Sequence, residues 1–181
     1  MRMLRLTGRR LLSLCLALCL HGVTAGVHAQ QVSDADVKAA LVYNFMVFVE
    51  WPDEGQARRA PLTICVAAAS ELQTSFQALR DKKVRGLPIV IQGLHASDDM
   101  ATCRVLYIDQ HLRAQWPLIR KKLAGSSLLT IADPAISRIE GAVIDLVTAD
   151  NKIGFEVDSI AARDANLLVS SKLLRLARKV H

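Results

Sequence analysis

Two acidic residues late in the chain are the first candidates for chemistry. Two β-favouring segments, 142–148 and 153–157, flank a turn at 150–151, and pairing them as an antiparallel hairpin places Asp145 opposite Glu156. Paired carboxylates can act as general acid and general base. Like charges that face each other are unfavourable, so a cation, water or a partner should separate them. The sequence offers no accompanying nucleophile, metal-ligand set or phosphate-binding loop, so a solvated or arginine-paired face is favoured and no catalytic residue is assigned.

Two cysteines supply the other candidate chemistry. Cys65 and Cys103 remain once the N-terminal leader that carries Cys15 and Cys19 is removed. In an exported domain such a pair is more often bonded than free, and closing a loop of this length would stabilise the fold by about 4 kcal/mol in the chain-entropy model. A reactive or metal-binding thiol pair is the alternative. A zinc site is disfavoured because no Cys-x-x-Cys spacing occurs and the histidines are scattered, so no metal and no cofactor is assigned.

The first 29 residues predict the compartment. Positions 1–10 carry four arginines, 11–20 form an apolar run, and small residues suit a cleavage site at 27–29, which is the order of a secretory signal peptide. The apolar run is shorter than the roughly 20 residues of a membrane-spanning helix. The net charge of +6 includes those four arginines, so it does not indicate nucleic-acid binding by the mature chain. With 2 Trp, 2 Tyr and 4 Phe, the chain also lacks an evident stacking platform for nucleic acid.

A helix is predicted to follow the leader. Ser33 resembles an N-cap, and apolar residues recur at helical spacing up to Phe48, before Trp51 and Pro52 end the segment. The helix is apolar nearly all round in its second half, so we expect it to be buried on two sides or, as a second interpretation, to contact a partner or a second copy. Asn44 lies within the apolar face, where a buried amide bonded to backbone is favoured over a ligand contact.

The remaining segments predict the fold class. Short apolar runs alternate with helical segments, which indicates an α/β domain over 30–181 with a three-layer, mostly parallel sheet, helices on both faces and the C-terminal antiparallel hairpin. The first and third strands of such a sheet are commonly neighbours, which would bring Cys65 near Cys103. The predicted strands are 62–67, 87–92, 105–108 and 128–132, and the predicted helices are 70–79, 113–123, 159–165 and 172–179.

Six segments form a distinctive ordered set: ALVYNFMVFVEWP (40–52), LTICVA (62–67), KKVRGLPIVI (82–91), CRVLYI (103–108), LLTIADP (128–134) and GFEVDSIAARDANLLVSSKLLRLARKV (154–180). The most specific parts are the tyrosine–asparagine–aromatic stretch that ends at Trp51 and Pro52 and the Ser-Ser-x-Leu-Leu motif at 170–174. Taken together and in order, these segments resemble the YfiR family of exported bacterial proteins, and the resemblance covers residues from about 36 to 180.

The resemblance implies a periplasmic α/β domain, often dimeric, with no enzymatic activity of its own. The best-understood members look like repressors that bind the periplasmic part of an inner-membrane diguanylate cyclase and lower cyclic di-GMP and biofilm formation. An outer-membrane lipoprotein can sequester such a repressor. Cys65 and Cys103 match the principal disulfide of the family, whereas a second cysteine pair found in some members is absent here.

We therefore expect a periplasmic repressor of a diguanylate cyclase, and the alternative is a small-ligand-binding sensor domain. The default place for a ligand in this fold class is the carboxyl end of the parallel strands. The candidate partner or ligand contacts are Asn44, Trp51, Asp145 and Glu156. No nucleic-acid partner is expected.

Overall fold

The sheet at the centre of the computed structural model has the predicted mostly parallel order. The structure describes residues 33–51, 60–95, 98–133, 135 and 138–181, so the predicted signal peptide and Pro52 lie outside the described residues. Strands β4, β2, β5, β6 and β7 run parallel, and β3 and β8 join the two ends antiparallel. The order across the sheet is β3 (Lys83–Val84), β4 (Leu87–Leu94), β2 (Leu62–Ala67), β5 (Cys103–Ile108), β6 (Leu129–Ala132), β7 (Ile144–Ala149), β8 (Lys152–Val157) and β10 (Lys179–Val180).

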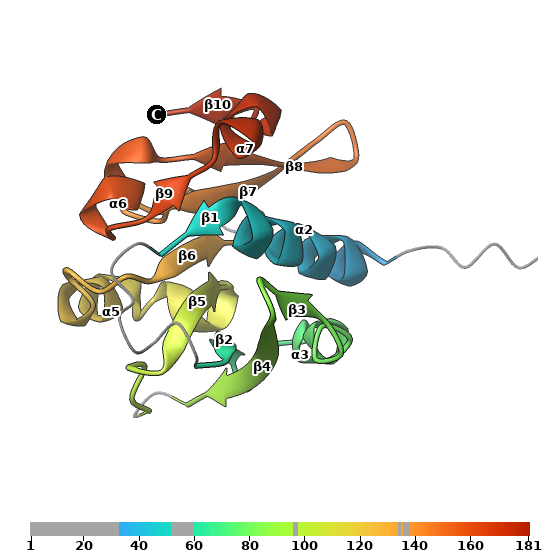
Figure 1. The fold of residues 1–181 in the computed structure, drawn as a ribbon, viewed down its shortest axis with the longest axis vertical. Helices are drawn as coiled ribbons and strands as arrows, with labels where there is room; N and C mark the ends of the chain where they lie inside the picture. Colours follow the sequence, from blue (N-terminus) through green and yellow to red (C-terminus); the bar gives the residue numbers. More distant parts are fainter. Residues whose placement is uncertain (1–32, 52–59, 96–97, 134, 136–137) are drawn as a thin grey trace, which may run out of the picture. The chain divides into compact units, whose positions relative to one another are not determined.

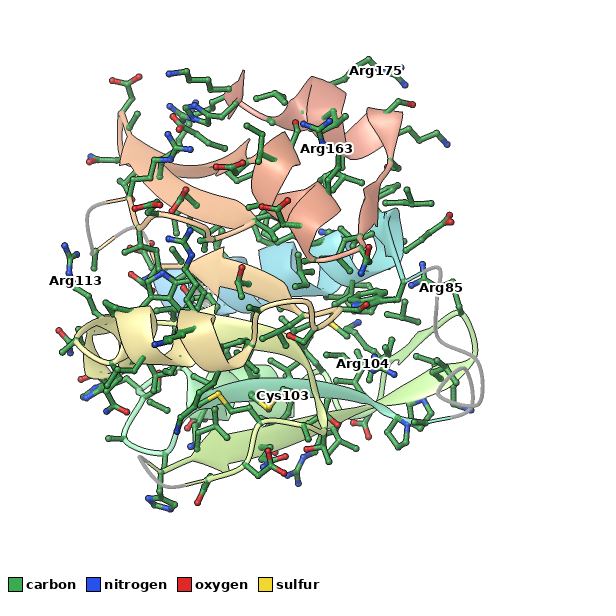
Figure 2. All side chains as sticks on the ribbon, turned by 90° about the vertical axis from the view of Figure 1, so that its left-hand side faces the viewer. Arg85, Cys103, Arg104, Arg113, Arg163 and Arg175 are labelled. Atoms are coloured by element: carbon green, nitrogen blue, oxygen red, sulfur yellow. A yellow bond between two sulfur atoms is a disulfide. The ribbon has the colours of Figure 1, made fainter. Side chains whose placement is uncertain are left out.

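Helices cover both faces of this sheet, as the sequence predicts. Side chains alternate along β2, so Ile64 belongs to one hydrophobic core and Cys65 to another on the opposite face. The first core receives α2 (Asp34–Phe48), α3 (Gln73–Gln77), α6 (Ser159–Asp164) and α7 (Ser171–Leu176). The second receives α4 (Gln110–Arg113) and α5 (Trp116–Lys122). Figure 1 shows α5 to the left and α2 to the right of the central strands, and the rotated view of Figure 2 shows α5 in front of the sheet with α2 behind it.

Helix α2 is the buried helix that its apolar sequence predicts. Ser33 caps it by accepting the Asp36 N–H at 3.1 Å. Its inward residues, among them Phe45 and Met46, are fully buried, and α3 and α7 pack along it, which explains why the helix has no clear polar side. The chain then forms a small antiparallel pair between β1 (Val49–Glu50) and β9 (Leu168–Val169). Asn44 lies on the exposed side of α2, so the expectation of a buried amide is wrong.

Three predicted helix boundaries are wrong for local reasons. The helix predicted over 113–123 is shorter in the structure, where α5 begins at Trp116 and the separate short helix α4 ends at Arg113. Pro117 lies in the first turn of α5, where its missing N–H has no cost. Helix α3 begins only after Leu72, because the Ser70 hydroxyl caps a turn by accepting the Leu72 N–H. Helix α7 ends at Leu176, and the following residues instead pair with β8 as strand β10.

The C-terminal hairpin is confirmed in its register. Asp145 pairs with Glu156, and Leu146 pairs with Phe155. Asp150 and Asn151 both have positive φ, 51° and 55°, which is the backbone of a type I′ turn and suits the twist of a two-residue hairpin.

Candidate functional site

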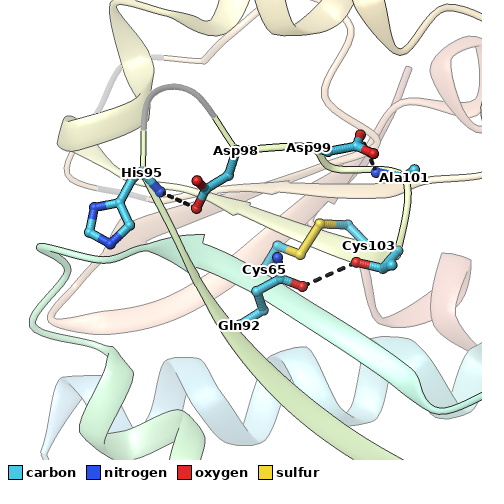
Figure 3. The surroundings of a disulfide bond; sticks show 8 residues. Cys65, Gln92, His95, Asp98, Asp99, Ala101 and Cys103 are labelled. Atoms are coloured by element: carbon cyan, nitrogen blue, oxygen red, sulfur yellow. Dashed lines mark hydrogen bonds between the residues drawn. A yellow bond between two sulfur atoms is a disulfide. The ribbon is translucent and has the colours of Figure 1, made fainter.

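The predicted disulfide between Cys65 and Cys103 is confirmed, and it joins the two central strands β2 and β5 (Figure 3). The two Cα atoms are 5.7 Å apart, and both residues are buried in the second core. At the same end of the strands, the Thr102 hydroxyl donates to the Gln92 side-chain oxygen at 3.1 Å, which ties β5 to β4. The cysteines are therefore a covalent clamp inside the fold in this structure, not a thiol pair that holds a metal.

The two carboxylates of the hairpin, Asp145 and Glu156, both bind other groups that reduce their mutual repulsion. Asp145 is only 4% exposed, and its Oδ2 accepts from Arg138 Nε at 3.3 Å, while Oδ1 accepts the Ile139 N–H at 3.5 Å. Burial raises the pKa of the Asp145 carboxyl, and the Ile139 N–H and the Arg138 charge oppose that rise. The arginine-paired interpretation is confirmed, whereas the solvated one does not hold for this buried carboxylate.

Arg138 connects these acidic residues into one network. Its Nη2 lies 3.2 Å from Asp158 Oδ2 and its Nη1 lies 3.2 Å from His181 Nδ1, while His181 Nε2 lies 2.8 Å from Glu156 Oε2. Because a guanidinium only donates, Nδ1 of His181 must accept, so Nε2 carries the hydrogen and donates to Glu156. We call Arg138, Asp145, Glu156, Asp158 and His181 the hairpin network.

The hairpin network has an excess of negative charge. One arginine stands against three carboxylates, so these four side chains carry a formal charge of −2. Buried Asp145 is enclosed, but the Glu156 and Asp158 side chains keep 24% and 19% of their surface exposed. The network can therefore present negative charge to a cationic group, while it holds no nucleophile for covalent chemistry.

Sequence reasoning found the two hairpin acids but missed Arg138 and His181, the side chains that bind them. Arg138 and His181 come from segments without periodic pattern, so no sequence signal placed them beside Asp145 and Glu156. Asp158 could have been found, because an aspartate directly before a helix is a favoured N-cap. Its Oδ1 accepts the N–H groups of Ile160 and Ala161 at 3.0 and 2.9 Å.

Asn44 and Trp51 lie in surroundings that differ from the hairpin network. Asn44 lines a groove of about 330 Å³ between α2 and α3, beside Tyr43, whose ring carries the Lys82 ammonium group 5.4 Å from its centroid. Trp51 is only 6% exposed and lies under the Arg85 guanidinium, 5.5 Å from the ring centroid.

Arg85 contacts both Trp51 and the backbone at the end of α2. The Arg85 guanidinium also donates to the Val49 carbonyl at 2.9 Å, so it holds the backbone that follows the helix as well as the indole. The Trp51 indole N–H has no hydrogen-bond partner among the described residues. Trp51 packs in the first core at the end of α2.

Side chains bond to one another at the carboxyl ends of β5 and β6, the default ligand position of this fold class. The Tyr107 hydroxyl donates to Asp133 Oδ2 at 2.6 Å, and Lys38 Nζ lies 2.9 Å from the same oxygen. Burial, then the Asp133 charge, raises the pKa of Tyr107, which keeps this hydroxyl a neutral donor.

A cavity of about 460 Å³ lies near the start of β6, between α5 and α6. Its apolar lining includes Leu128, Val143 and Ala161, and its charged lining consists of Arg120, Lys121 and Asp164. This volume falls in the range of small-molecule sites.

In the described part of the chain, no helix is long and apolar enough to cross a membrane, and no group of three or more His, Cys, Asp or Glu could hold a metal ion.

Comparison with known proteins gives the chain its family. No curated protein gives a significant match to the chain. A family model described as YfiR/HmsC-like matches residues 35–178, from the start of α2 almost to the C-terminus. This family consists of periplasmic, regulatory, non-catalytic domains of diguanylate cyclase signalling. The chain therefore belongs to the YfiR/HmsC-like family.

Proposed function

We propose that this protein represses an inner-membrane diguanylate cyclase by binding the cyclase's periplasmic part directly, which lowers cyclic di-GMP and biofilm formation. The observation that carries the proposal is the family match over residues 35–178. The fold adds a supporting argument: the described residues form a disulfide-clamped domain with a charged edge and without a catalytic constellation. Such a domain is suited to act by occupying a partner's surface.

The hairpin network is the contact surface that we assign to the cyclase. Glu156 uses one carboxylate oxygen to accept from His181, and its partial exposure leaves the carboxylate open to a second donor. With a formal charge of −2 on its arginine and three carboxylates, the network favours a lysine or arginine on the partner. Asn44 and Trp51 are secondary candidates, because Asn44 is exposed beside a groove and Trp51 supports the end of α2.

Two further contacts belong to the proposal. Exposed apolar side chains occur on the elements after β8, namely Ile160 (58%), Leu168 (57%) and Leu176 (68%). Solvent-exposed leucines and isoleucines of this kind are candidates for a homodimer contact or for an outer-membrane lipoprotein that would sequester the repressor. Measuring the mass of the purified protein by light scattering would test the dimer.

The test of the proposed function is the cellular level of cyclic di-GMP in a deletion strain, with and without the gene restored. Repression predicts a rise on deletion that complementation reverses. No change in a strain that expresses the protein would contradict the proposal. In vivo crosslinking followed by identification of the partner would then show whether the contact with the cyclase is direct.

A small-ligand sensor is the second candidate function, and the cavity between α5 and α6 favours it. A panel of small metabolites tested by thermal shift on the wild type and on Ala165→Leu, which narrows this cavity, would examine it. A ligand that stabilises the wild type and not the variant would support the sensor. Equal shifts, or none, would leave the cavity without a ligand role.

A further inference from the structure

The outer surface of α5 carries positive charge that the hairpin network does not account for, although Arg120 and Lys121 also line the cavity between α5 and α6. Residues 110–122 contain three arginine or lysine residues in the last turn of α5, a further arginine and one histidine, but no aspartate or glutamate. Trp116 and Ile119 face the second core. The helical period therefore turns Leu118, Lys121 and Lys122 outward, and all three are exposed. Helix α5 lies on the side of the molecule that Figure 2 views.

These outward charges are largely unneutralised. Arg120 pairs with Glu140 at 3.0 Å, but this is a surface pair in which the Glu140 side chain is 88% exposed. Lys121 and Lys122 make no ion pair within residues 33–51, 60–95, 98–133, 135 and 138–181. Basic residues in a last turn also suit the helix dipole, yet the dipole does not explain Leu118, which is 68% exposed beside them. We call Leu118, Arg120, Lys121 and Lys122 the α5 stripe.

We propose that the α5 stripe docks the protein on an anionic phospholipid surface. Lysine is a strongly hydrated point charge, is depleted at protein–protein interfaces and is well suited to lipid phosphates. A single exposed leucine between such charges fits the headgroup region, into which it can insert without a matching pocket. The proposal rests on the periplasmic location and not on repression, and it leaves the negatively charged hairpin network for a protein partner.

The test is flotation of the protein, purified in the form that cells export, with vesicles of phosphatidylcholine alone or with added phosphatidylglycerol. We expect binding to the phosphatidylglycerol vesicles only, weakening as salt rises. Each lysine near an anionic surface contributes about fivefold in affinity, so Lys121→Gln/Lys122→Gln should weaken binding by about 25-fold. The matched control is Lys152→Gln/Lys172→Gln, which removes two exposed lysines outside α5 and should bind like the wild type.

Three outcomes would overturn the proposal. The first is the absence of wild-type binding to phosphatidylglycerol vesicles, and the second is equal loss in the stripe and control variants, which would mean a net-charge effect. The third is that the wild type does not bind vesicles but binds a membrane protein, and that replacing Lys121 and Lys122 abolishes this binding. That outcome would make the α5 stripe a protein contact. Because the vesicles contain no cyclase, failure here is distinguishable from failure of repression.

Discussion

The centre of the sheet and its hairpin edge are held together by different interactions. At β2 and β5 the strands are joined by the Cys65–Cys103 bond inside an apolar core, where neither pH nor salt acts on the link. At β7, β8 and β10 the strands are joined by charges around Arg138, and those charges respond to both. The comparison indicates a fixed scaffold at the centre and an adjustable, partner-facing edge at the hairpin.

The largest expected effect comes from breaking the scaffold. Replacing both cysteines, Cys65→Ser/Cys103→Ser, should lower the free energy of unfolding by about 2–5 kcal/mol, because the unfolded chain regains the entropy of an open loop. Denaturant unfolding of the variant and of the wild type, with and without reductant, measures this loss. Equal stability of the oxidised and reduced wild type would show that the bond is not a clamp.

Breaking the hairpin network should cost less. Arg138→Gln leaves the buried Asp145 carboxylate without its cation, and the expected loss is about 1–2 kcal/mol, since the arginine side chain is 45% exposed. A double-mutant cycle with Asp145→Asn measures the coupling between the two groups. If the effects of Arg138→Gln and Asp145→Asn on the free energy of unfolding were additive, the Arg138–Asp145 ion pair would not be the main stabilising contact of the hairpin edge.

The pH dependence of stability sharpens the comparison further. The pKa of Asp145 is raised from its ordinary 3.8, so the folded protein binds this proton more tightly than the unfolded chain does. That contribution to stability is present below pH 3.8 and is lost as the pH rises through the raised pKa. The stability of the wild type relative to Asp145→Asn should therefore fall over this interval.

Unfolding curves of the wild type and of Asp145→Asn at a series of pH values would measure this fall in stability. Glu140→Gln serves as a control at an exposed carboxylate. A constant difference between the wild type and Asp145→Asn across the pH range would contradict the raised pKa.

The smallest effect on stability is expected at Glu156. In Glu156→Gln the amide oxygen can still accept from His181 Nε2, so the free energy of unfolding should change by less than about 1 kcal/mol. Thermal unfolding measures this change. A large loss would mean that the Glu156 charge is structural and not available to a partner.

The sequence predicts the centre of the molecule better than its edge. The mostly parallel sheet, the hairpin register and the Cys65–Cys103 pairing follow from apolar periodicity, from turn residues and from a chemistry that only cysteine offers. The hairpin network depends on Arg138, which has no periodic context, and on His181, which reaches Glu156 only because β10 pairs with β8. Helix propensity extended the last helix through Lys179, whereas tertiary pairing at the edge of β8 overrides that local preference.

The account's central claim is that the protein represses the cyclase through the hairpin edge. The most direct measurement is cyclic di-GMP in a deletion strain that carries the wild type, Glu156→Lys or the exposed control Glu140→Lys, each shown by circular dichroism to be folded. The account predicts that the wild type and Glu140→Lys restore the low level and that Glu156→Lys does not. Full restoration by folded Glu156→Lys would contradict the claim and remove this edge from the binding surface.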